Sequence, residues 1–575
     1  MLLPEGVDEH SAPIWSHCEI YIELRTNESH DAFSDEDGEP LESETEEGNE
    51  TRSLLTKHAA DLMACQHRCF LFTVEICGRR VRFLRWDRSG CTVSAYFDIY
   101  QEPEKLAAFF YQYSRLTREL RGHDPTAKIA SSEEQEALQD AIKDFAMDAR
   151  ARGLSASQVL HTMGNECFAP HVVTVERTEE DKQDKLQFVV GMPFHDERTP
   201  CGRATRVYAA YCAETGELAC LKDTWRTDDE GFQTEHDIYD TLNKAGVSHL
   251  ATNLFEGHYM MQETLTSKLT LEEERPKWMK PCNDMTPRVH CRVIQQLGFP
   301  LYSAKNSKEV VAAIRDAVQC VYEARDKASI LHRDLSLGNI LLDKNKGGFL
   351  NDWDLASSCE NMRLGRTGTW QFLSIALLQD PHKKHSVQDD VESAVWVLLN
   401  VSLHYLKLKE KPSTFSIAFF DEVRVDEAAD GIPRGGRGKE KLFMSGLPKS
   451  VHWECAPLDK LIRDLTRFFG KIFVLRVFRN PDPSHFEELD KLQKDLESGD
   501  GILNIFDDAL KRDDWLEHDR VFEDQFATPE QRLEKRVRTN SEKTLSGMLA
   551  SQGLPSTSTR TSAAAPSPAK KARRW

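Results

Sequence analysis

The sequence predicts an α+β protein with more than one folded part, and three observations support this prediction. Alternating apolar and polar residues, which are typical of strands, recur in two blocks of the chain, near residues 69–99 and 186–222. Each block is followed by long segments with apolar residues at helical spacing. Hydrophobic residues make up 40% and charged residues 29% of the 575-residue chain, so a sizeable core can form beside polar segments that remain unfolded.

Composition and charge exclude several classes of protein. The net charge of −20 argues against a general nucleic-acid-binding surface, which needs a basic stripe. The fourteen cysteines form no CxxC pair, which favours a reduced, intracellular protein, and the first residues do not form a signal peptide. The most apolar stretch, Val391 to Leu406, is interrupted by polar residues. It predicts a buried core helix, so we expect no membrane span.

The first block predicts an N-terminal α+β accessory domain over residues 1–160. Residues 69–99 have the strand and turn pattern of an antiparallel meander. Residues 34–52 are rich in acidic residues and largely lack apolar ones, which predicts a disordered insert. Residues 103–153 have helical spacing.

The C-terminal residues 527–575 form a Ser/Thr/Pro-rich basic segment that predicts a disordered tail. Basic clusters at 535–538 and 570–574 are of the kind that nuclear import receptors bind. They favour an intracellular protein that is imported into the nucleus, and the alternatives are a merely solubilising tail or a weak RNA contact.

The strongest chemical signal is the segment from His332 to Leu342, which reads HRDLSLGNILL. It places Asp334 five positions before Asn339, directly ahead of an apolar strand pattern. At this spacing the Asp can orient a hydroxyl group, and the Asn can reach a metal ion bound to phosphates. The segment resembles the catalytic loop of protein kinases, and Asp352 in the later segment LNDWDLA matches the Mg²⁺-binding Asp of that family.

The resemblance extends upstream of the catalytic loop. Lys222, in a strand pattern, matches the lysine that anchors the ATP phosphates, and Glu235, at the start of a helical pattern, matches its ion-pair partner. The glycine-rich loop is degenerate. Gly202 and Val207 remain as nucleotide-binding candidates, but Ala204 restricts the positive φ angles that glycine allows.

A hinge between two lobes is predicted at residues 292–300. The resemblance places the adenine contacts near Gln295 and Leu297. A helix is predicted to begin at Asn306, where a capping residue precedes an apolar stripe, and to continue to the catalytic loop.

Three positions downstream resemble the activation segment and the helix that follows it. Thr369 matches the threonine that contacts the catalytic Asp in serine/threonine kinases. Ala376 replaces the Glu that anchors the segment through an Arg salt bridge. Asp390 matches a buried Asp that braces the catalytic loop, although an acidic residue is equally expected at any helix N-terminus.

The chain is similar to the fungal-type protein kinase domain in several short motifs, over roughly residues 12–510. These motifs include WSHCEIYIE at 15–23, RWDRSG at 85–90, LKDTWR at 221–226, RTGT at 366–369 and DVES at 390–393. The family implies a bilobal protein-kinase-like fold over residues 185–515, behind an extra N-terminal region. The small lobe would span about 185–297 and the large lobe about 298–515.

The resemblance implies an ATP- and Mg²⁺-dependent kinase that phosphorylates Ser or Thr of protein substrates. Asp334 would orient the acceptor hydroxyl, Asp352 and Asn339 would hold Mg²⁺, and Lys222, held by Glu235, would anchor the phosphates. The alternatives are a pseudokinase scaffold and a small-molecule phosphotransferase of the aminoglycoside or choline kinase type. For the N-terminal domain, an interaction or regulatory role is favoured over a nuclease-like metal site.

Overall fold

The computed structural model describes the greater part of the chain. The described residues are 18–36, 40–152, 154, 169–179, 182–227, 233–255, 262–270, 285–344, 347–359, 366–410, 417–425, 431–477 and 483–526. Met1–Gln525 form one compact unit and Phe526–Trp575 a second. The predicted tail at 527–575, with both basic clusters, lies outside the described residues.

The N-terminal part contains a five-stranded sheet with strand order β1-β2-β3-β4, in which β5 pairs with β3. The strands are β1 (Tyr21–Arg25), β2 (Phe70–Cys77), β3 (Arg80–Asp87), β4 (Gly90–Val93) and β5 (Phe97–Asp98). Strands β2, β3 and β4 are antiparallel neighbours, which confirms the predicted meander. Strand β1 is parallel to β2, and helix α1 (Glu46–Cys65) forms the crossover that a parallel pair needs.

Helix α1 corrects part of the predicted disordered insert at residues 34–52. The helix begins at Glu46, and the side chain of Thr45 caps it by accepting a hydrogen bond from the third residue of the helix. The acidic segment also supplies Asp35, which lies 2.7 Å from Nη1 of the buried Arg82. Composition failed here because an acidic residue that pairs with a buried guanidinium stabilises order, and that partner is distant in the sequence.

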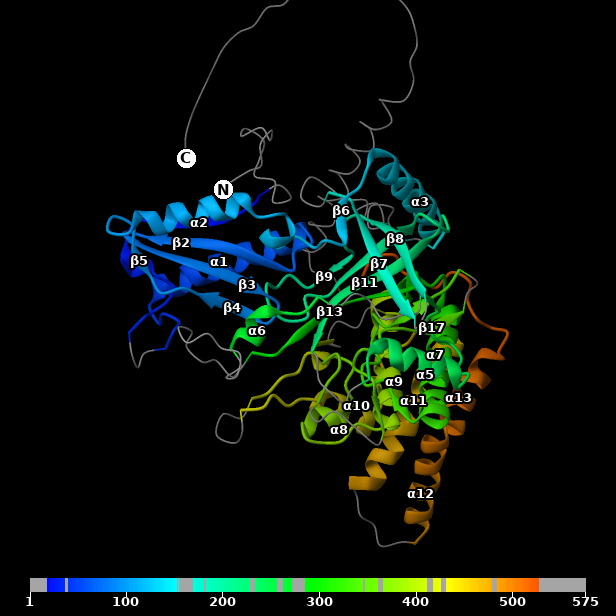
Figure 1. The fold of residues 1–575 in the computed structure, drawn as a ribbon. Coiled ribbons are helices and arrows are strands. Elements are labelled where there is room, and N and C mark those ends of the chain that lie inside the picture. The colour runs from blue at the N-terminus through cyan, green and yellow to red at the C-terminus, as the bar shows by residue number, and fades with distance from the viewer. Residues whose placement is uncertain are drawn as a thin grey trace, which may run out of the picture. The chain divides into compact units, whose positions relative to one another are not determined.

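Two helices cover opposite faces of this sheet, as Figure 1 shows for α1 and α2 (Pro103–Arg115). Successive strand residues point to opposite faces. Leu71 therefore shares a core with Leu62 of α1, whereas Val74 of the same strand shares a core with Tyr113 of α2.

The small lobe is built on an eight-stranded sheet of order β12-β13-β11-β10-β8-β7-β6, in which β9 pairs with β10. Its strands are β6 (Ala127–Ile129), β7 (His171–Glu179), β8 (Lys182–Val190), β9 (His195–Asp196), β10 (Arg206–Cys212), β11 (Leu218–Thr227), β12 (Asn253–Phe255) and β13 (Arg288–Gln296). Helix α5 (Glu235–Lys244) follows β11. The strand patterns of the second sequence block correspond to β8, β10 and β11.

The predicted domain boundary at residue 160 differs from the structure. Strand β6 pairs with β7 at the edge of the small-lobe sheet, and helix α3 (Ser132–Ala151) packs on the same sheet. Leu138 of α3 shares a core with Val172 of β7 and Val189 of β8. Strand β6 and helix α3 therefore precede the predicted boundary in sequence but belong to the small lobe, because the small-lobe sheet covers their apolar side.

Hydrogen bonds also join the N-terminal sheet to the small lobe. The turn after β3 meets the short helix α6 (Leu265–Thr270). Ser89 Oγ donates to Thr264 Oγ1 at 2.5 Å, and the backbone N–H of Thr266 donates to Asp87 Oδ2 at 2.7 Å. The two sheets therefore meet through specific polar contacts.

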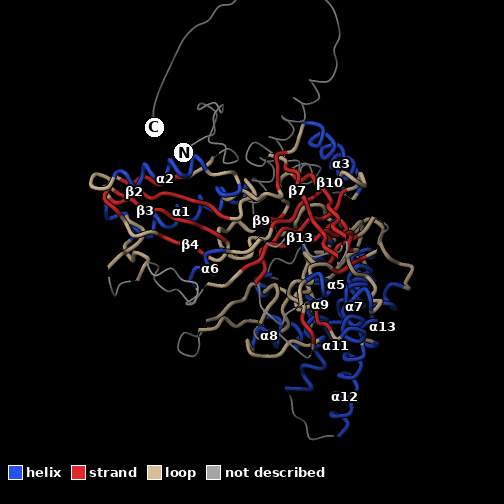
Figure 2. Tube along the Cα trace, in the orientation of Figure 1, coloured by secondary structure: helices blue, strands red, loops and turns tan. Residues whose placement is uncertain are grey.

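The large lobe is mostly helical, as the helices from α7 onward in Figure 2 show. Its helices are α7 (Ser307–Ala328), α8 (Ile375–Gln379), α9 (Val387–Tyr405), α10 (Arg437–Ser445), α11 (Ala456–Val477), α12 (Pro483–Ser498) and α13 (Asp500–Leu510). Short strands flank the catalytic loop: β14 (Phe299–Pro300), β15 (Ile330–Leu331), β16 (Ile340–Leu342), β17 (Gly348–Leu350) and β18 (Ser357–Ser358).

Two sequence predictions about these helices are confirmed. Helix α7 begins directly after its N-cap Asn306, whose side chain accepts a hydrogen bond from the N–H of Glu309 at 3.0 Å. The apolar segment at 391–406 forms most of α9, which is buried along most of its length. Among the described residues, no helix is long and apolar enough to span a bilayer.

Candidate active site

Lys222 forms the centre of the site between the lobes. Its Nζ lies 3.0 Å from Oε2 of Glu235 and 2.5 Å from Oδ1 of Asp352. Strand β11 supplies the lysine. Helix α5 presents Glu235 as its first residue, because Thr234 and Asp237 form a capping box there. Lys222 and Glu235 therefore form the predicted ion pair, and Asp352 contacts the same ammonium group.

The ammonium group of Lys222 and the carboxylate of Asp352 stabilise each other's charge. Burial acts to lower the pKa of Lys222, but Asp352 and Glu235 outweigh it and raise the pKa well above its usual value. Burial likewise acts against ionisation of Asp352, yet the adjacent ammonium group lowers the pKa of this carboxyl. Burial raises the pKa of Glu235 to about 7. At neutral pH the site thus presents a charged lysine and an ionised Asp352, which suits a phosphate and a cation.

Asp390 of helix α9 supports the catalytic loop through hydrogen bonds to its backbone. This fully buried carboxyl group accepts hydrogen bonds from the backbone N–H of His332 at 3.2 Å and of Arg333 at 3.1 Å. His385 Nε2 contacts the same group at 2.8 Å. Arg333 has a φ of 71°, a left-handed conformation that is costly for a residue with a side chain. The bonds to Asp390 hold the loop in this conformation, which gives the acidic residue a role beyond the helix N-terminus.

Asp334 is oriented by two neighbours. Its Oδ1 accepts hydrogen bonds from both the N–H and the hydroxyl of Thr369, at 2.7 and 2.8 Å. The amide nitrogen of Asn339 donates to the backbone oxygen of Asp334 at 2.8 Å. Thr369 therefore makes the contact that the sequence predicted, and the amide oxygen of Asn339 remains as a potential ligand.

The loop that carries Asp352 lies beside the catalytic loop. The N–H of Asn351 donates to the backbone oxygen of Asn339 at 2.9 Å. Trp353 is fully buried, and its backbone N–H donates to Glu235 Oε1 at 3.2 Å. Asp352 itself has a φ of 61°. These contacts connect the loop to helix α5 and bring Lys222, Glu235 and Asp352 together beside the catalytic loop.

The loop that replaces the glycine-rich loop differs from expectation. It runs from residue 191 to 205 between β8 and β10 and includes the short strand β9. Gly202 has a φ of 94°, but its N–H donates to the backbone oxygen of Arg88, in the turn between β3 and β4, at 2.9 Å. Ala204 adopts a φ of 45°, so the predicted restriction on positive φ is not observed. The surrounding contacts outweigh the strain of a left-handed alanine.

Three further nucleotide-binding candidates lie on or beside the small-lobe sheet. Val207 stands opposite Lys222 in the β10–β11 register, so both side chains share one face of the sheet. Gln295 is buried in β13 opposite Cys220, and Leu297 follows directly after this strand. The structure therefore places Val207 beside the lysine and leaves the adenine contacts of Gln295 and Leu297 a prediction.

An anchor for the end of the activation segment was missed by sequence reasoning. Ala376 cannot form the usual salt bridge, but the fully buried Lys439 of α10 donates from Nζ to the backbone oxygen of Leu373 at 2.7 Å. Glu392 of α9 accepts from the N–H of Ile375 at 2.8 Å. Burial lowers the pKa of Lys439 to about 7 and raises the pKa of Glu392 to about 7. Nothing in the local sequence pattern indicates this pair.

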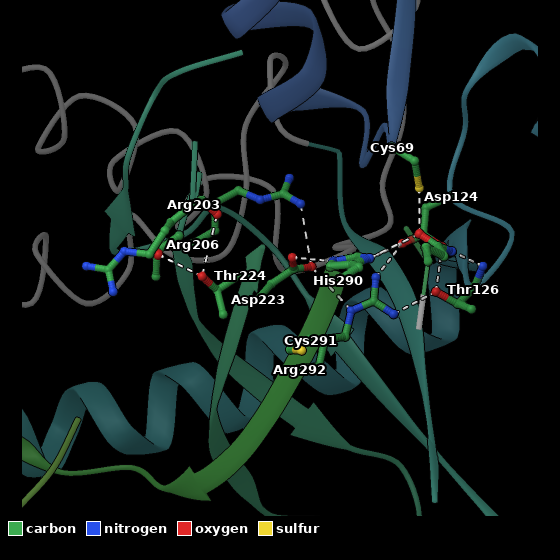
Figure 3. Close-up of polar contacts among 12 residues, drawn as sticks. Cys69, Asp124, Thr126, Arg203, Arg206, Asp223, Thr224, His290, Cys291 and Arg292 are labelled. Carbon is green, nitrogen blue, oxygen red and sulfur yellow. Dashed lines mark hydrogen bonds and ion pairs between the residues drawn. The ribbon is translucent and has the colours of Figure 1, made fainter. Parts of the chain in front are cut away.

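A buried polar cluster lies behind the lysine strand (Figure 3). Because neighbouring strand residues face opposite ways, Asp223 points away from the Lys222 side. It contacts His290 Nε2 at 2.7 Å and Arg292 Nε at 3.2 Å. Cys69, Asp124 and His290 approach closely enough to hold a metal ion. Arg292 already pairs with Asp124, however, so we interpret the cluster as a hydrogen-bonded joint between the two sheets.

The two lobes, the lysine held by a helix glutamate and the paired loops define a protein-kinase-like protein. The sequence model of the fungal protein kinase family matches residues 38–402, which is more than half of the chain. The chain therefore belongs to the fungal protein kinase family. This match is shorter than the span that the motifs suggested, and it ends within helix α9.

Two other comparisons add little. A search of curated proteins found no match. Among solved structures, a ROP18 kinase domain in complex with AMP-PNP and sucrose aligns with a TM-score of 0.29 and 12% sequence identity. The alignment covers 68% of this chain and 100% of that chain. A TM-score this low carries no argument about the present chain.

Proposed function

We propose that this chain is a protein kinase that uses ATP and Mg²⁺ to phosphorylate serine or threonine residues of protein substrates. The observation that carries the proposal is the position of Lys222 Nζ, 3.0 Å from Glu235 and 2.5 Å from Asp352. A charged lysine next to a carboxylate metal ligand is the arrangement that a bound nucleoside triphosphate requires. Because phosphoryl transfer depends mostly on positioning and charge, this arrangement supports catalysis and not only binding.

The residues present fit a magnesium ion. Asp352 is ionised, and the amide nitrogen of Asn339 is used by Asp334, which leaves the Asn339 oxygen as a hard donor. Asp352 and Asn339 would hold the ion, and when bound it would neutralise charge on the phosphates. Lys222 would contact the phosphates and keep the nucleotide oriented.

The acceptor would be a hydroxyl group that Asp334 orients. Thr369 occupies Oδ1 of Asp334 through two hydrogen bonds, at 2.7 and 2.8 Å. Oδ2 accepts one longer hydrogen bond, from the amide nitrogen of Asn339 at 3.4 Å, and has a lone pair left to take the hydroxyl proton. This threonine contact supports serine or threonine as the acceptor.

The decisive experiment measures transfer of labelled phosphate by the purified full-length protein with ATP and Mg²⁺. The acceptor panel contains a mixed protein substrate, an aminoglycoside and choline. We expect label on Ser or Thr of protein, and a loss of several orders of magnitude in Asp334→Asn and Asp352→Ala. Asp490→Asn, an exposed change on α12, serves as the matched control and should retain activity.

Each alternative predicts a different result. A pseudokinase scaffold would fold and show no transfer to any acceptor. A small-molecule phosphotransferase would label choline or the aminoglycoside but not protein. Either outcome, or activity of Asp352→Ala within tenfold of the parent, would contradict the proposal.

A further inference from the structure

In the loop over the nucleotide site, several backbone N–H groups of the kind that a glycine-rich loop offers to phosphates are bonded within the protein. The N–H of Gly202 donates to Arg88, and the N–H of Phe194 donates to the oxygen of Val207. The N–H groups of Glu197 and Thr199 are also bonded within the protein, to Thr205 and Glu197. These four N–H groups cannot donate to phosphates while they hold these bonds, so a side-chain donor from this loop can take their place.

The side chain of Arg203 reaches from this loop to the loop that carries Asp352. Its Nη1 forms an ion pair with Oδ2 of Asp354, two residues after Asp352. Burial acts to lower the pKa of Arg203, but the charges of Asp354 and Asp352 outweigh it and raise the pKa. Its side chain is 43% exposed, so a ligand can reach it.

The backbone of Arg203 is hydrogen-bonded to strand β11, which also carries Lys222. Its carbonyl oxygen accepts a hydrogen bond from the N–H of Trp225 at 2.9 Å, three residues after Lys222 in β11. Figure 3 shows Arg206, three residues further along the chain, reaching toward Asp223, with which it forms an ion pair. Arg203 therefore lies at a fixed point above the site, and its flexible side chain can move.

We propose that Arg203 binds the phosphates of the nucleotide, taking the role of the loop amides that are bonded within the protein. The guanidinium would leave Asp354 and form a bidentate contact with phosphate oxygens, which match its planar geometry and carry more charge than one carboxylate. The Arg203–Asp354 pair is then the resting state of the empty site. This inference rests on the proposed function, because it assumes that the cleft takes a nucleoside triphosphate.

A simpler role for Arg203 would be to hold Asp354 in place. The two roles differ in what happens when Asp354 is changed. If Arg203 binds phosphate, Asp354→Asn frees the guanidinium and leaves ATP affinity the same or higher. If Arg203 only positions Asp354, Arg203→Met and Asp354→Asn weaken ATP binding alike.

The experiment is calorimetric titration of the full chain with Mg²⁺–ATP and, separately, with adenosine, which has no phosphate. We expect Arg203→Met to weaken ATP binding about 10- to 100-fold, the range for losing charge-assisted hydrogen bonds, with adenosine affinity unchanged. Arg203→Lys keeps the positive charge but not the two parallel donors of the guanidinium group, so ATP affinity should fall several-fold while the protein still folds. Asp354→Asn should not weaken ATP binding, and the double variant should behave as Arg203→Met does.

Three results would overturn the inference. They are equal losses in Arg203→Met and Asp354→Asn, an equal loss for adenosine, and unchanged ATP affinity in both Arg203 variants. The titration measures binding without turnover. If the parent protein binds ATP and the Arg203 variants bind it with the same affinity, the inference about Arg203 is contradicted but the proposed function is not. A parent protein that fails to bind ATP contradicts the proposed function as well.

Discussion

Replacing Asp390 with alanine tests whether this buried carboxyl group supports the catalytic loop. In the structure it accepts hydrogen bonds from the N–H groups of His332 and Arg333 at 3.2 and 3.1 Å, and His385 Nε2 lies 2.8 Å away. Asp390→Ala leaves these three buried groups without their acceptor, at a cost of about 1–3 kcal/mol each. Partial filling of the space by water reduces the total, so we expect the free energy of unfolding to fall by about 3–5 kcal/mol.

The variant should also lose activity for a separate reason. Arg333 is held at a φ of 71° by these hydrogen bonds, and without them its backbone can relax toward a more favourable conformation. That movement would displace the adjacent Asp334. We therefore expect kcat to fall even where the protein remains folded.

The assay is urea unfolding followed by tryptophan fluorescence, because Trp353 and Trp396 are both fully buried in the large lobe. Asp390→Asn keeps one acceptor oxygen and should cost about 1–3 kcal/mol, since one backbone N–H then faces the amide NH₂. The exposed change Asp490→Ala on α12 is the control. It removes a surface ion pair with Lys494, and because such pairs contribute little to stability, the midpoint should be nearly unchanged. A loss below about 1 kcal/mol for Asp390→Ala would refute the reasoning, because it would mean that these donors find other acceptors.

Two further predictions follow from the structure, and a third follows from the basic residues near the C-terminal end of the sequence. Lys439 has a folded pKa of about 7, below its unfolded value, so the folded protein bears the full cost of its buried charge at and below pH 7. In paired unfolding curves, the stability of the parent relative to Lys439→Met should rise from pH 7 to 9, by at most about 1.4 kcal/mol per pH unit; a flat difference would show that this lysine is not buried as a charge. Arg88 donates to the oxygen of Thr199 at 2.8 Å and so holds the loop over the nucleotide site. Arg88→Met should raise the KM for ATP more than it lowers kcat, and an unchanged KM would exclude this positioning role. A fluorescent fusion that lacks residues 566–575 should be depleted from the nucleus, and an identical distribution of full and truncated chains would rule out a terminal import signal.

The sequence by itself determined those parts of the fold and site that depend on neighbouring residues. The segment from His332 to Asn339 carries its chemistry within one loop, so Asp334 and Asn339 could be selected together from their spacing, and the two residues are hydrogen-bonded in the structure. The start of helix α7, directly after its N-cap Asn306, could also be predicted from the sequence, because the cap and the apolar stripe lie within a few residues of each other. Lys222 and Glu235 could be paired only through resemblance to a family, since their contact spans the strand and helix that the structure brings together.

Tertiary structure alone decided the contacts that join distant parts of the chain. The anchor of Leu373 by Lys439, the tether of Gly202 to Arg88 and the order of the acidic residues beside Arg82 each pair groups far apart in sequence. The physical reason is the same in each case. A buried charge or N–H is tolerated only where the fold supplies its partner, and neither composition nor periodicity records which distant residue that partner is.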